Sequence, residues 1–422
     1  MTYSIFPKVF KAGASATLKI KMNGAEKCGE VGVKIQPMES YGIEHSPLYR
    51  IDEEERYPYY PAEALGDGWY SVEYFFPSEQ KYSIRVRMDG APVWRECYIY
   101  AVDSDLMSLR PFKGDTHLHT NRSDGEGTPF EVSIRYRAAG FDFIAITDHH
   151  RMYPSVEAIE RLAPLTDAFT VIRAEEVHNK DMGYFHVINL GGAHSVNEII
   201  EADDGVAERE VERILGEQTA PEGTAPYVLA YRKFITNEIR RGGGIAVMAH
   251  PYWSCFGEYN MQTADTLHLL RTGVYDALEV LAGCDSNGNG NDIQLALWQE
   301  LLYEGIRIPV LGASDSHSTT KPTSRFNKQF SIAFAPDAGG LLDAIKGGMT
   351  VAVERRSEED FRVIGSLRLT KYARFLMEEY YPSYLPLTAA HADALGREDV
   401  PALRDAEAAI NRYFADFFGA QH

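Results

Sequence analysis

The chain has 422 residues, of which 45% are hydrophobic and 24% are charged. This is an ordinary globular composition, with room for two or three domains of roughly 100–200 residues each. The formal net charge of −19 argues against a long nucleic-acid groove, since such a groove needs lysine and arginine to replace phosphate counterions. No stretch approaches the roughly 18 consecutive apolar residues of a membrane-spanning helix, so no membrane partner is expected.

The four cysteines, Cys28, Cys97, Cys255 and Cys284, are scattered and form no CxxC pair. This spacing indicates reduced thiols rather than a disulfide framework. The opening residues, MTYSIFPKVFKAG, lack the apolar core and the small-residue cleavage site of a signal peptide. Both features predict a cytoplasmic protein.

Residues 1–110 are predicted to form a small all-β domain. Short runs rich in β-branched and aromatic residues, such as ATLKIKM and KYSIRVRM, are separated by turn signals such as MNG, LGDG and MDG. This pattern is typical of an immunoglobulin-like sandwich. It leaves open whether the domain binds a partner or braces the rest of the chain.

From residue 111 to 355, short apolar strands alternate with helical segments. The expected strands are 141–147, 168–174, 184–190, 244–249, 276–281 and 306–313. The first expected helix follows Thr128 as its N-cap, begins with Pro129 and ends at Gly140 as its C-cap. Such alternation predicts parallel βα units, in a barrel or an open sheet, with the chemistry at the carboxyl ends of the strands.

Two insertions interrupt this alternation. Residues 201–243 are expected to contain two helices, which could form a lid or pad the barrel, and residues 284–292 form an oxygen-rich loop. After about residue 355 the chain is again helical. The predicted domains are therefore 1–110, 111–355 and a C-terminal helical extension, 356–422.

Many of the chain's 13 histidines accompany carboxylates at the ends of the expected strands. The set comprises His117, His119, Asp148, His149, His150, Glu175, Glu176, His186, His250, Asp315 and His317. Taken singly, each could be an ordinary polar residue at a strand end, and Asp148 could be an N-cap. Parallel strands, however, would bring these side chains together at the carboxyl-terminal end of the sheet or barrel, which favours a metal site.

The types and number of these side chains restrict the metal. Imidazole and carboxylate ligands without thiolate fit Zn, Mn or Fe. About nine candidate ligands exceed what one ion requires, so two to three divalent ions are expected. Ions held about 3.5–4 Å apart suit phosphoryl transfer, because they contact both the attacking and the leaving oxygen.

The ordered set of motifs resembles the PHP family, the polymerase and histidinol phosphatase superfamily of metal-dependent phosphoesterases. The matching segments are DTHLHTNRSDG (115–125), ITDHH (146–150), the Glu175–Glu176 step, FHVINL (185–190), MAHP (248–251) and GASDSH (312–317). They occur in the family's order. The resemblance implies an α/β fold with a distorted seven-stranded (β/α) barrel and a trinuclear metal site.

The resemblance also assigns a ligand set to each ion. The first ion would take His117, His119 and Asp315, the second would take His186 and His250, and the third would take Asp124, His149 and His317. A carboxylate of the third motif would bridge the first two ions. Glu176 matches the bridging position, because Ala174 stands where the family has a glycine, and Glu175 remains the rival.

Further residues are expected to act beside the ions. His150 and His178 are candidates for substrate binding or proton donation, Asp148 and Asp115 for orienting imidazoles, and Arg122 and Arg151 for bidentate contact with phosphate. For each arginine a surface salt bridge is an equally supported alternative. Tyr252 and Trp253 could form an aromatic wall for a substrate ring or could simply pack within their loop.

The resemblance predicts hydrolysis of a small phosphorylated substrate, a monoester or diester such as a nucleotide or sugar phosphate, by a water activated between two ions. Two other classes stay open, a metal-dependent amidohydrolase and a non-catalytic metal-binding scaffold. Asp124, His149 and His317 favour the phosphoesterase, since an amidohydrolase site typically holds one or two ions. The sequence does not indicate an oligomeric state.

Overall fold

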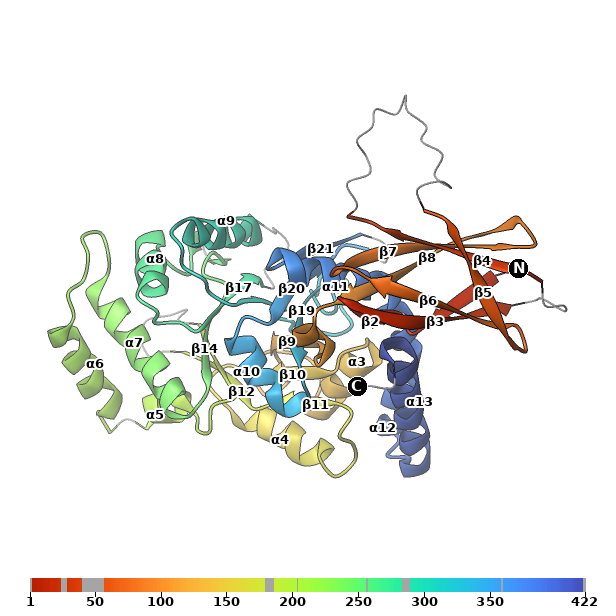
Figure 1. Ribbon diagram of the computed structural model, residues 1–422. Coiled ribbons are helices and arrows are strands. Elements are labelled where there is room, and N and C mark those ends of the chain that lie inside the picture. The colour runs from red at the N-terminus through yellow and green to blue at the C-terminus, as the bar shows by residue number, and fades with distance from the viewer. Residues whose placement is uncertain are drawn as a thin grey trace. The chain divides into compact units, whose positions relative to one another are not determined.

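The computed structural model describes residues 2–23, 29–39, 57–178, 186–202, 204–255, 257–282, 289–357 and 360–419 (Figure 1). The chain divides into two units. The first comprises Met1–Leu109, Lys371–Tyr384 and Glu407–His422, and the second comprises Arg110–Thr370 and Leu385–Ala406. The predicted C-terminal extension, 356–422, is therefore shared between the units. Its helices are α11 (Leu367–Glu379), α12 (Tyr381–Gly396) and α13 (Val400–Phe418).

The first unit contains one eight-stranded sheet with the order β1-β3-β6-β5-β4-β7-β8-β2. Its strands are β1 (Thr2–Phe6), β2 (Val9–Lys11), β3 (Ala14–Asn23), β4 (Val31–Pro37), β5 (Tyr59–Gly66), β6 (Trp69–Phe76), β7 (Gln80–Met88) and β8 (Ala91–Val102), followed by the short helix α2 (Ser104–Met107). All neighbouring strands are antiparallel except β2 and β8.

The predicted sandwich of the first unit is one continuous sheet. Strand β5 pairs with both β4 and β6 and so connects the two halves. Leu18 and Ile20 of β3 share a buried cluster with Val33 of β4 and Ile84 of β7. The two halves thus enclose a single hydrophobic core, which gives the sandwich-like alternation of buried and exposed residues without two separate sheets.

The cysteine prediction is only partly covered by the described residues. Cys97 is buried in the core of the first unit as a free thiol. Cys28, Cys284 and the side chain of Cys255 lie outside the described part of the chain.

The strands of the second unit form two larger sheets. One has the order β11-β10-β9-β19-β20-β21 and the other has the order β12-β13-β14-β17-β18. The first consists of β9 (Arg110–Leu118), β10 (Phe143–Ile146), β11 (Thr170–Ile172), β19 (Gln329–Ala335), β20 (Thr350–Arg355) and β21 (Phe361–Ile364). The second consists of β12 (Ala174–Val177), β13 (Val187–Leu190), β14 (Ile245–Met248), β17 (Ala277–Leu281) and β18 (Val310–Gly312).

Helices separate many of these strands, which confirms a mixed α/β class. They are α3 (Pro129–Ala138), α4 (Tyr153–Leu162), α5 (Val196–Glu201), α6 (Val206–Glu217), α7 (Pro226–Arg241), α8 (Thr263–Arg271), α9 (Asn289–Tyr303), the 3-10 turn Ala338–Gly340 and α10 (Leu341–Lys346). Helix α3 starts as predicted, with Thr128 and Glu131 forming a capping box. Its C-cap is Ala139, and Gly140 follows in the left-handed conformation at φ 87°.

The expectation of parallel βα units is confirmed for only some of the strand pairs. The pairs β9–β10, β10–β11, β14–β17 and β17–β18 are parallel, but β12–β13, β13–β14, β9–β19, β19–β20 and β20–β21 are antiparallel. A parallel crossover needs about a dozen residues or more. The segment 178–186 between β12 and β13 is shorter, so these two strands can only run in opposite directions.

The pairings between the named strands form two separate sheets rather than one seven-stranded barrel. Phe143 and Ala333 of one sheet share a buried cluster with Ile188, Val247 and Leu311 of the other, so the two sheets enclose a common core. Two isolated parallel bridges join the sheets, Leu118 to Ser316 and His149 to Glu176. Both bridges lie beside predicted site residues.

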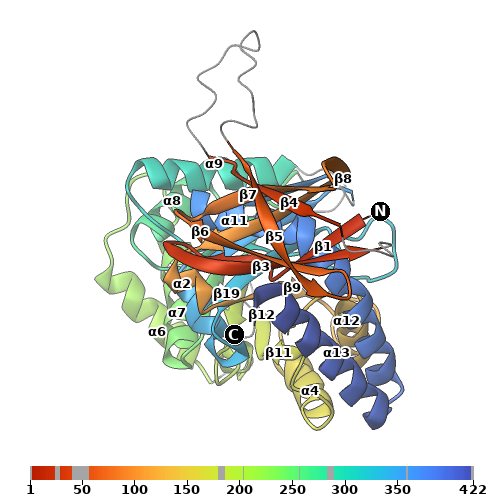
Figure 2. The same cartoon turned by 45° about the vertical axis from the view of Figure 1, so that its right-hand side comes forward.

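The insertion 201–243 contains helices α6 and α7, as predicted, and they lie side by side in both views (Figure 2). Val211 of α6 and Phe234 of α7 belong to the same buried cluster as Val187 and Met248 of the neighbouring strands. This burial favours a packing role over a lid. None of the described helices is both long and apolar enough to cross a membrane.

Gly312 of β18 provides a test of the packing between the two sheets. A Cβ at this position would lie 2.4 Å from the Phe330 carbonyl oxygen and 3.2 Å from Ala352 Cα. We expect Gly312→Ala to lower the free energy of unfolding by about 1–3 kcal/mol, because backbone must move to relieve the overlap. Urea denaturation measures the change.

Gly216→Ala is the matched control. Gly216 lies in α6, and a Cβ added to it would meet no atom within 4 Å, so alanine should leave stability unchanged or raise it by roughly 0.5–1 kcal/mol. Equal stability of Gly312→Ala and the original chain would contradict the packing described for β18.

Candidate metal centre

The predicted ligands lie where the two sheets of the second unit meet. His117 lies in β9 and His119 follows it, His149 follows β10, Glu176 lies in β12, His186 precedes β13, His250 follows β14, and Asp315 and His317 follow β18. The structure therefore brings together side chains that are up to 200 positions apart in sequence (317 − 117). Four of the strands involved, β9, β10, β14 and β18, present these residues at or just after their carboxyl ends, as the sequence predicted.

A buried group forms around Asp315. Ligand atoms of His117, His119 and Asp315 lie within 4.8 Å of one another. The Asp315 Oδ1 atom is 3.0 Å from His119 Nε2 and 3.4 Å from His117 Nε2. This is the set predicted for the first ion. His117 Nε2 is buried and has no hydrogen-bond partner among the described residues, although it faces carboxylates, as a metal ligand would.

Glu176 occupies the centre of the histidine cluster. Its Oε1 atom lies 2.6 Å from His186 Nδ1 and 3.5 Å from His250 Nε2. Its Oε2 atom lies 2.7 Å from His149 Nδ1 and 3.5 Å from His117 Nε2. The two oxygens thus face different imidazoles, which is the arrangement a bridging carboxylate requires.

Glu175 points to the opposite face of β12, because side chains alternate along a strand. Its carboxylate accepts hydrogen bonds from Asn189 Nδ2, Ser195 Oγ, the Val196 amide and Asn197 Nδ2, at 2.6–2.9 Å. The sequence left open whether Glu175 or Glu176 is the candidate bridging carboxylate. Glu176 is the one that faces the imidazoles.

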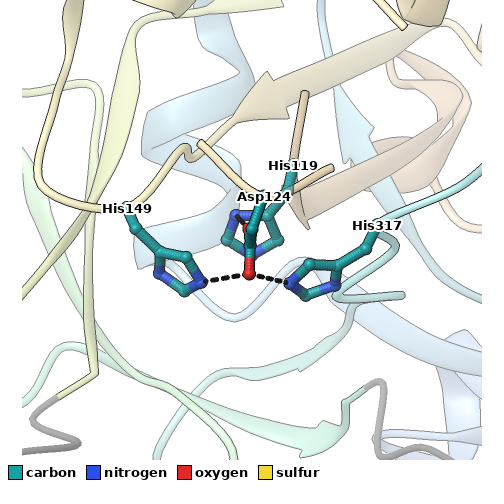
Figure 3. Close-up of side chains that lie close together, drawn as sticks. All are labelled: His119, Asp124, His149 and His317. Carbon is teal, nitrogen blue, oxygen red and sulfur yellow. Dashed lines mark ion pairs between the residues drawn. The ribbon is translucent and has the colours of Figure 1, made fainter. Parts of the chain in front are cut away.

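A second group consists of side chains that point toward one another from three segments of the chain (Figure 3). Ligand atoms of His119, Asp124, His149 and His317 lie within 4.8 Å of one another. Asp124 Oδ2 is 3.5 Å from His149 Nε2 and 3.3 Å from His317 Nε2. The side chains of Asp124 and His317 are 55% and 40% exposed, whereas His119 is fully buried. The predicted third set is therefore present, with His119 as an additional neighbour.

The loop that carries Asp124 is held by Asp148. The Asp148 carboxylate accepts four hydrogen bonds, from the amides and hydroxyls of Thr120 and Ser123, at 2.6–3.0 Å. These bonds replace the predicted contact between Asp148 and an imidazole. Gly125 completes the turn, because a Cβ there would lie 2.6 Å from the His119 backbone.

Asp115 also differs from its predicted role. Its carboxylate accepts hydrogen bonds from the amides of His117 and Ser314 and from the Tyr136 hydroxyl, at 3.0–3.2 Å. Burial raises the pKa of Asp115 to about 6, although these hydrogen bonds oppose the shift. Asp115 thus fixes the backbone around His117 rather than an imidazole.

The two remaining predicted histidines lie beside the cluster. His178 Nε2 is 2.7 Å from His149 Nδ1 and 3.7 Å from Glu176 Oε2, so His178 also fits a ligand position. The ring of His150 lies 4.4 Å from that of His178 and is half exposed, with its Nδ1 atom 3.4 Å from Glu201.

The two predicted phosphate-binding arginines point elsewhere or remain peripheral. Arg122 donates from Nε and Nη2 to the Glu157 carboxylate at 2.9 and 2.7 Å, which is the surface salt bridge considered as its alternative. Arg151 donates from Nε to the His149 carbonyl at 3.2 Å.

Glu279 is a site residue that the sequence reasoning missed. It lies fully buried in β17, and its Oε1 atom is 3.0 Å from His117 Nδ1. A signal was available, since Glu279 is the one charged residue in the apolar run ALEVL. A carboxylate inside such a strand needs buried hydrogen-bond donors.

The pKa values follow from burial and from the mixture of charges. Burial lowers the pKa of His119 and of His186, each to about 3. Burial also lowers the pKa of His149, but the carboxylates of Glu176 and Asp124 outweigh it and raise the value to about 10. For His317 the carboxylates of Asp124 and Asp315 likewise outweigh burial and raise the pKa to about 9.

Comparison with known proteins gives structural similarities only. No protein-family model and no curated protein matches the sequence. One similar solved structure is a two-domain protein of Bacteroides vulgatus containing a predicted PHP-like metal-dependent phosphoesterase, with 19% identity, a TM-score of 0.40, and coverage of 58% of this chain and 65% of that protein. The present chain thus spans less than two thirds of that protein's length.

Two further structures are similar in the same way. A candidate metal-dependent phosphoesterase of Bifidobacterium adolescentis has 17% identity and a TM-score of 0.38, and the match covers 56% of this chain and 94% of that protein. An amidohydrolase of Chromobacterium violaceum has 19% identity and a TM-score of 0.35, over 50% of this chain and 89% of that protein. Because these TM-scores are below 0.5, the functional assignment rests on the side chains of the site.

Asp124→Asn tests the solvent-exposed group. Removal of the charge should reduce the bound divalent metal by about one ion per chain and leave the buried groups loaded, because only Asp124 is altered. Metal analysis after dialysis measures this. Glu126→Gln is the control, since Glu126 lies in the same loop but pairs with Lys321 and Ser318. Equal metal content in Asp124→Asn and the unmodified protein would contradict a metal role for this group.

Metal affinity should fall as the pH is lowered. The raised pKa values of His149 and His317 mean that both rings carry a proton at pH 7 in the metal-free protein, whereas a bound imidazole must be neutral. Binding of Mn²⁺ should therefore release protons, and its affinity should decrease between about pH 8 and about pH 6. Calorimetric titration in buffers of different ionisation enthalpy counts the protons, and no release at pH 7 would contradict these pKa shifts.

Proposed function

We propose that the protein is a metal-dependent phosphoesterase of the PHP family that hydrolyses a small phosphorylated substrate. The observation that carries this proposal is the convergence of imidazoles and carboxylates into four overlapping groups of three or four ligand atoms. The described groups contain no thiolate, which favours Zn, Mn or Fe. The family's seven-stranded barrel belongs to the same proposal, and the two bridges that join the sheets support it.

The residues present fit two or three ions. His117, His119 and Asp315 would hold the first, and His186 and His250 the second, with Glu176 between them. Asp124, His149 and His317 would hold the third. When bound, such ions lower the pKa of water and neutralise charge on phosphoryl oxygens.

The protein's own side chains suggest how a substrate would approach. The exposed group around Asp124 and His317 gives access from solvent, while His117 and Glu176 are sealed from it. We infer that the phosphate enters on the exposed side. His150 is half exposed next to His178, so a substrate could reach it. Burial and the neighbouring His178, however, lower the pKa of His150 to about 4, which favours substrate contact over proton donation near neutral pH. His178 is better placed as a metal ligand.

Of the two aromatic residues predicted to contact a substrate ring, Trp253 is the one that lies beside the histidines. Trp253 lies 5.5 Å from the His186 ring and 5.7 Å from the His250 ring, measured between centroids. Tyr252 is buried, and its hydroxyl donates to Thr263. Trp253 is therefore the residue against which a ring of the substrate would stack, which supports a nucleotide among the possible substrates.

The two alternative classes, an amidohydrolase and a non-catalytic metal-binding scaffold, differ from a phosphoesterase in metal content and turnover. An amidohydrolase would need one or two ions, whereas the exposed group around Asp124 offers a further set of ligand atoms. A non-catalytic scaffold would bind metal without turnover. The net charge of −19 supports a small phosphorylated partner over long nucleic acid. The cytoplasmic location stays a prediction.

The proposal predicts metal-dependent release of phosphate. Protein reconstituted with Mn²⁺ or Zn²⁺ should hydrolyse members of a panel of phosphomonoesters and phosphodiesters, and EDTA should abolish the activity. The same panel should include simple amides and lactams. Turnover of amides but of no phosphate ester would favour the amidohydrolase, and fewer than two bound ions per chain after reconstitution would contradict the trinuclear site.

His117→Ala should reduce kcat/KM by at least about 100-fold, because loss of a partner that only supports a ligand already costs 10–100-fold. His268→Ala is the control, since His268 lies in α8 and belongs to none of the ligand groups. Near-normal phosphoesterase activity of folded His117→Ala would rule out His117 as an essential ligand.

A further inference from the structure

A buried glutamate connects the first two ligand sets. Glu279 lies in β17 and is fully buried. Its Oε1 atom lies 3.0 Å from His117 Nδ1, within hydrogen-bond distance, and its Oε2 atom accepts a hydrogen bond from the His250 amide at 3.1 Å. Each oxygen therefore contacts a different proposed ligand residue, one through its ring and one through its backbone.

We propose that Glu279 is a positioning residue that selects the metal-binding tautomer of His117 and fixes the backbone of His250. This inference rests on the proposed function, because it concerns ions at the same site. An ionised carboxylate only accepts hydrogen bonds, so the proton of the neutral His117 ring must be on Nδ1. The lone pair is then on Nε2.

The geometry at Nε2 agrees with this assignment. His117 Nε2 lies 3.4 Å from Asp315 Oδ1 and 3.5 Å from Glu176 Oε2, and it has no hydrogen-bond partner among the described residues. It therefore faces the carboxylates that are proposed to share its ion. A histidine that binds metal through one nitrogen commonly donates its other N–H to a carboxylate, which also makes the ring a stronger ligand.

Glu279 acts between the two sheets. His117 belongs to β9 of the six-stranded sheet, while Glu279 and His250 belong to the five-stranded sheet or follow its strands. The pairing of β17 with β18 shifts register between Glu279 and Leu281. Such bulges redirect side chains next to functional sites. A single carboxylate thereby sets the position of a ligand to the first ion relative to a ligand to the second.

A purely structural role does not account for a carboxylate here. Folding would be served as well by an apolar residue, as at the other positions of β17, because burial of a charge is unfavourable without compensation. Both hydrogen bonds described for Glu279 lead to proposed ligand residues. The charge is therefore explained by what it does to those ligands.

Glu279→Gln provides the test. The amide has one acceptor oxygen and one NH₂ group. If NH₂ faces His117, it donates to Nδ1 and places the ring proton on Nε2, which then cannot bind metal. If NH₂ faces His250, it opposes the amide N–H of that residue. We expect an affinity for Zn²⁺ or Mn²⁺ about 10–100-fold weaker than that of the unmodified protein, measured by titration of the metal-free protein against a chelator.

Glu175→Gln is the matched control. Glu175 is also fully buried and also accepts several hydrogen bonds, but from Asn189, Ser195, Val196 and Asn197 rather than from an imidazole. It should lose thermal stability and keep its metal affinity. Equal metal affinity of folded Glu279→Gln and the unmodified protein would overturn the inference. If the unmodified protein itself binds no metal, the proposed function fails instead.

A second measurement needs no change at Glu279. In zinc-loaded protein labelled with ¹⁵N-histidine, the ring nitrogens of His117 should show a protonated Nδ1 and a metal-bound Nε2. A His117→Gln spectrum identifies the signals. Protonation of Nε2 or metal binding through Nδ1 would contradict the inference even if Glu279→Gln does not fold.

Discussion

The Glu176 carboxylate, buried among imidazoles from several strands, is the interaction on which the site depends. Burial raises the pKa of a carboxyl group, but the interactions of Glu176 with His186, His117 and His149 outweigh this and hold its pKa well below its usual value. The charged form of Glu176 is thus stable only while cations surround it. Without bound metal, the raised pKa values of His117 and His149 make their protonated rings the cations beside Glu176, whereas His186 is neutral near pH 7; bound metal would take the place of those protons.

The arrangement of β12 makes this possible. Glu175 and Glu176 are adjacent, yet the strand sends them to opposite faces with different tasks. Glu175 is satisfied by Asn189 and the segment at the start of α5, and this anchors the strand. Glu176 is left to the histidines. Of these two neighbouring carboxylates, Glu175 therefore stabilises the strand and Glu176 faces the proposed metal site. The alternation of side chains along the strand is sufficient to separate the two roles.

The sequence predicted which side chains converge, because each of them lies at or near a strand end. His117, His149 and Asp315 follow directly from short motifs, and the structure brings them together. The strand directions were not predicted, because the length of a connection, such as 178–186, decides between parallel and antiparallel pairing. Arg122 was ambiguous, since it lies in a turn and its partner Glu157 lies in helix α4, 35 positions away.

Other features depend on contacts that no local pattern encodes. Glu279 contacts His117 across 162 positions in sequence, so only its unusual place in an apolar strand could have identified it. The continuous sheet of the first unit depends on β5, which pairs on both edges. Alternation of residue types is the same in a two-sheet sandwich and in one sheet that encloses its own core, so the two cannot be separated by periodicity.

The bridge between His149 and Glu176 has a mechanical consequence. Two residues proposed to bind metal also form one of the two bridges between the sheets. Ions bound by His149 and by Glu176 would link the two sheets at this bridge, in addition to the backbone hydrogen bonds from His150 N to Glu176 O and from Glu176 N to Asp148 O. Binding of metal would then be coupled to the stability of the contact between the two sheets. The ions would stabilise the fold of this unit as well as take part in its chemistry.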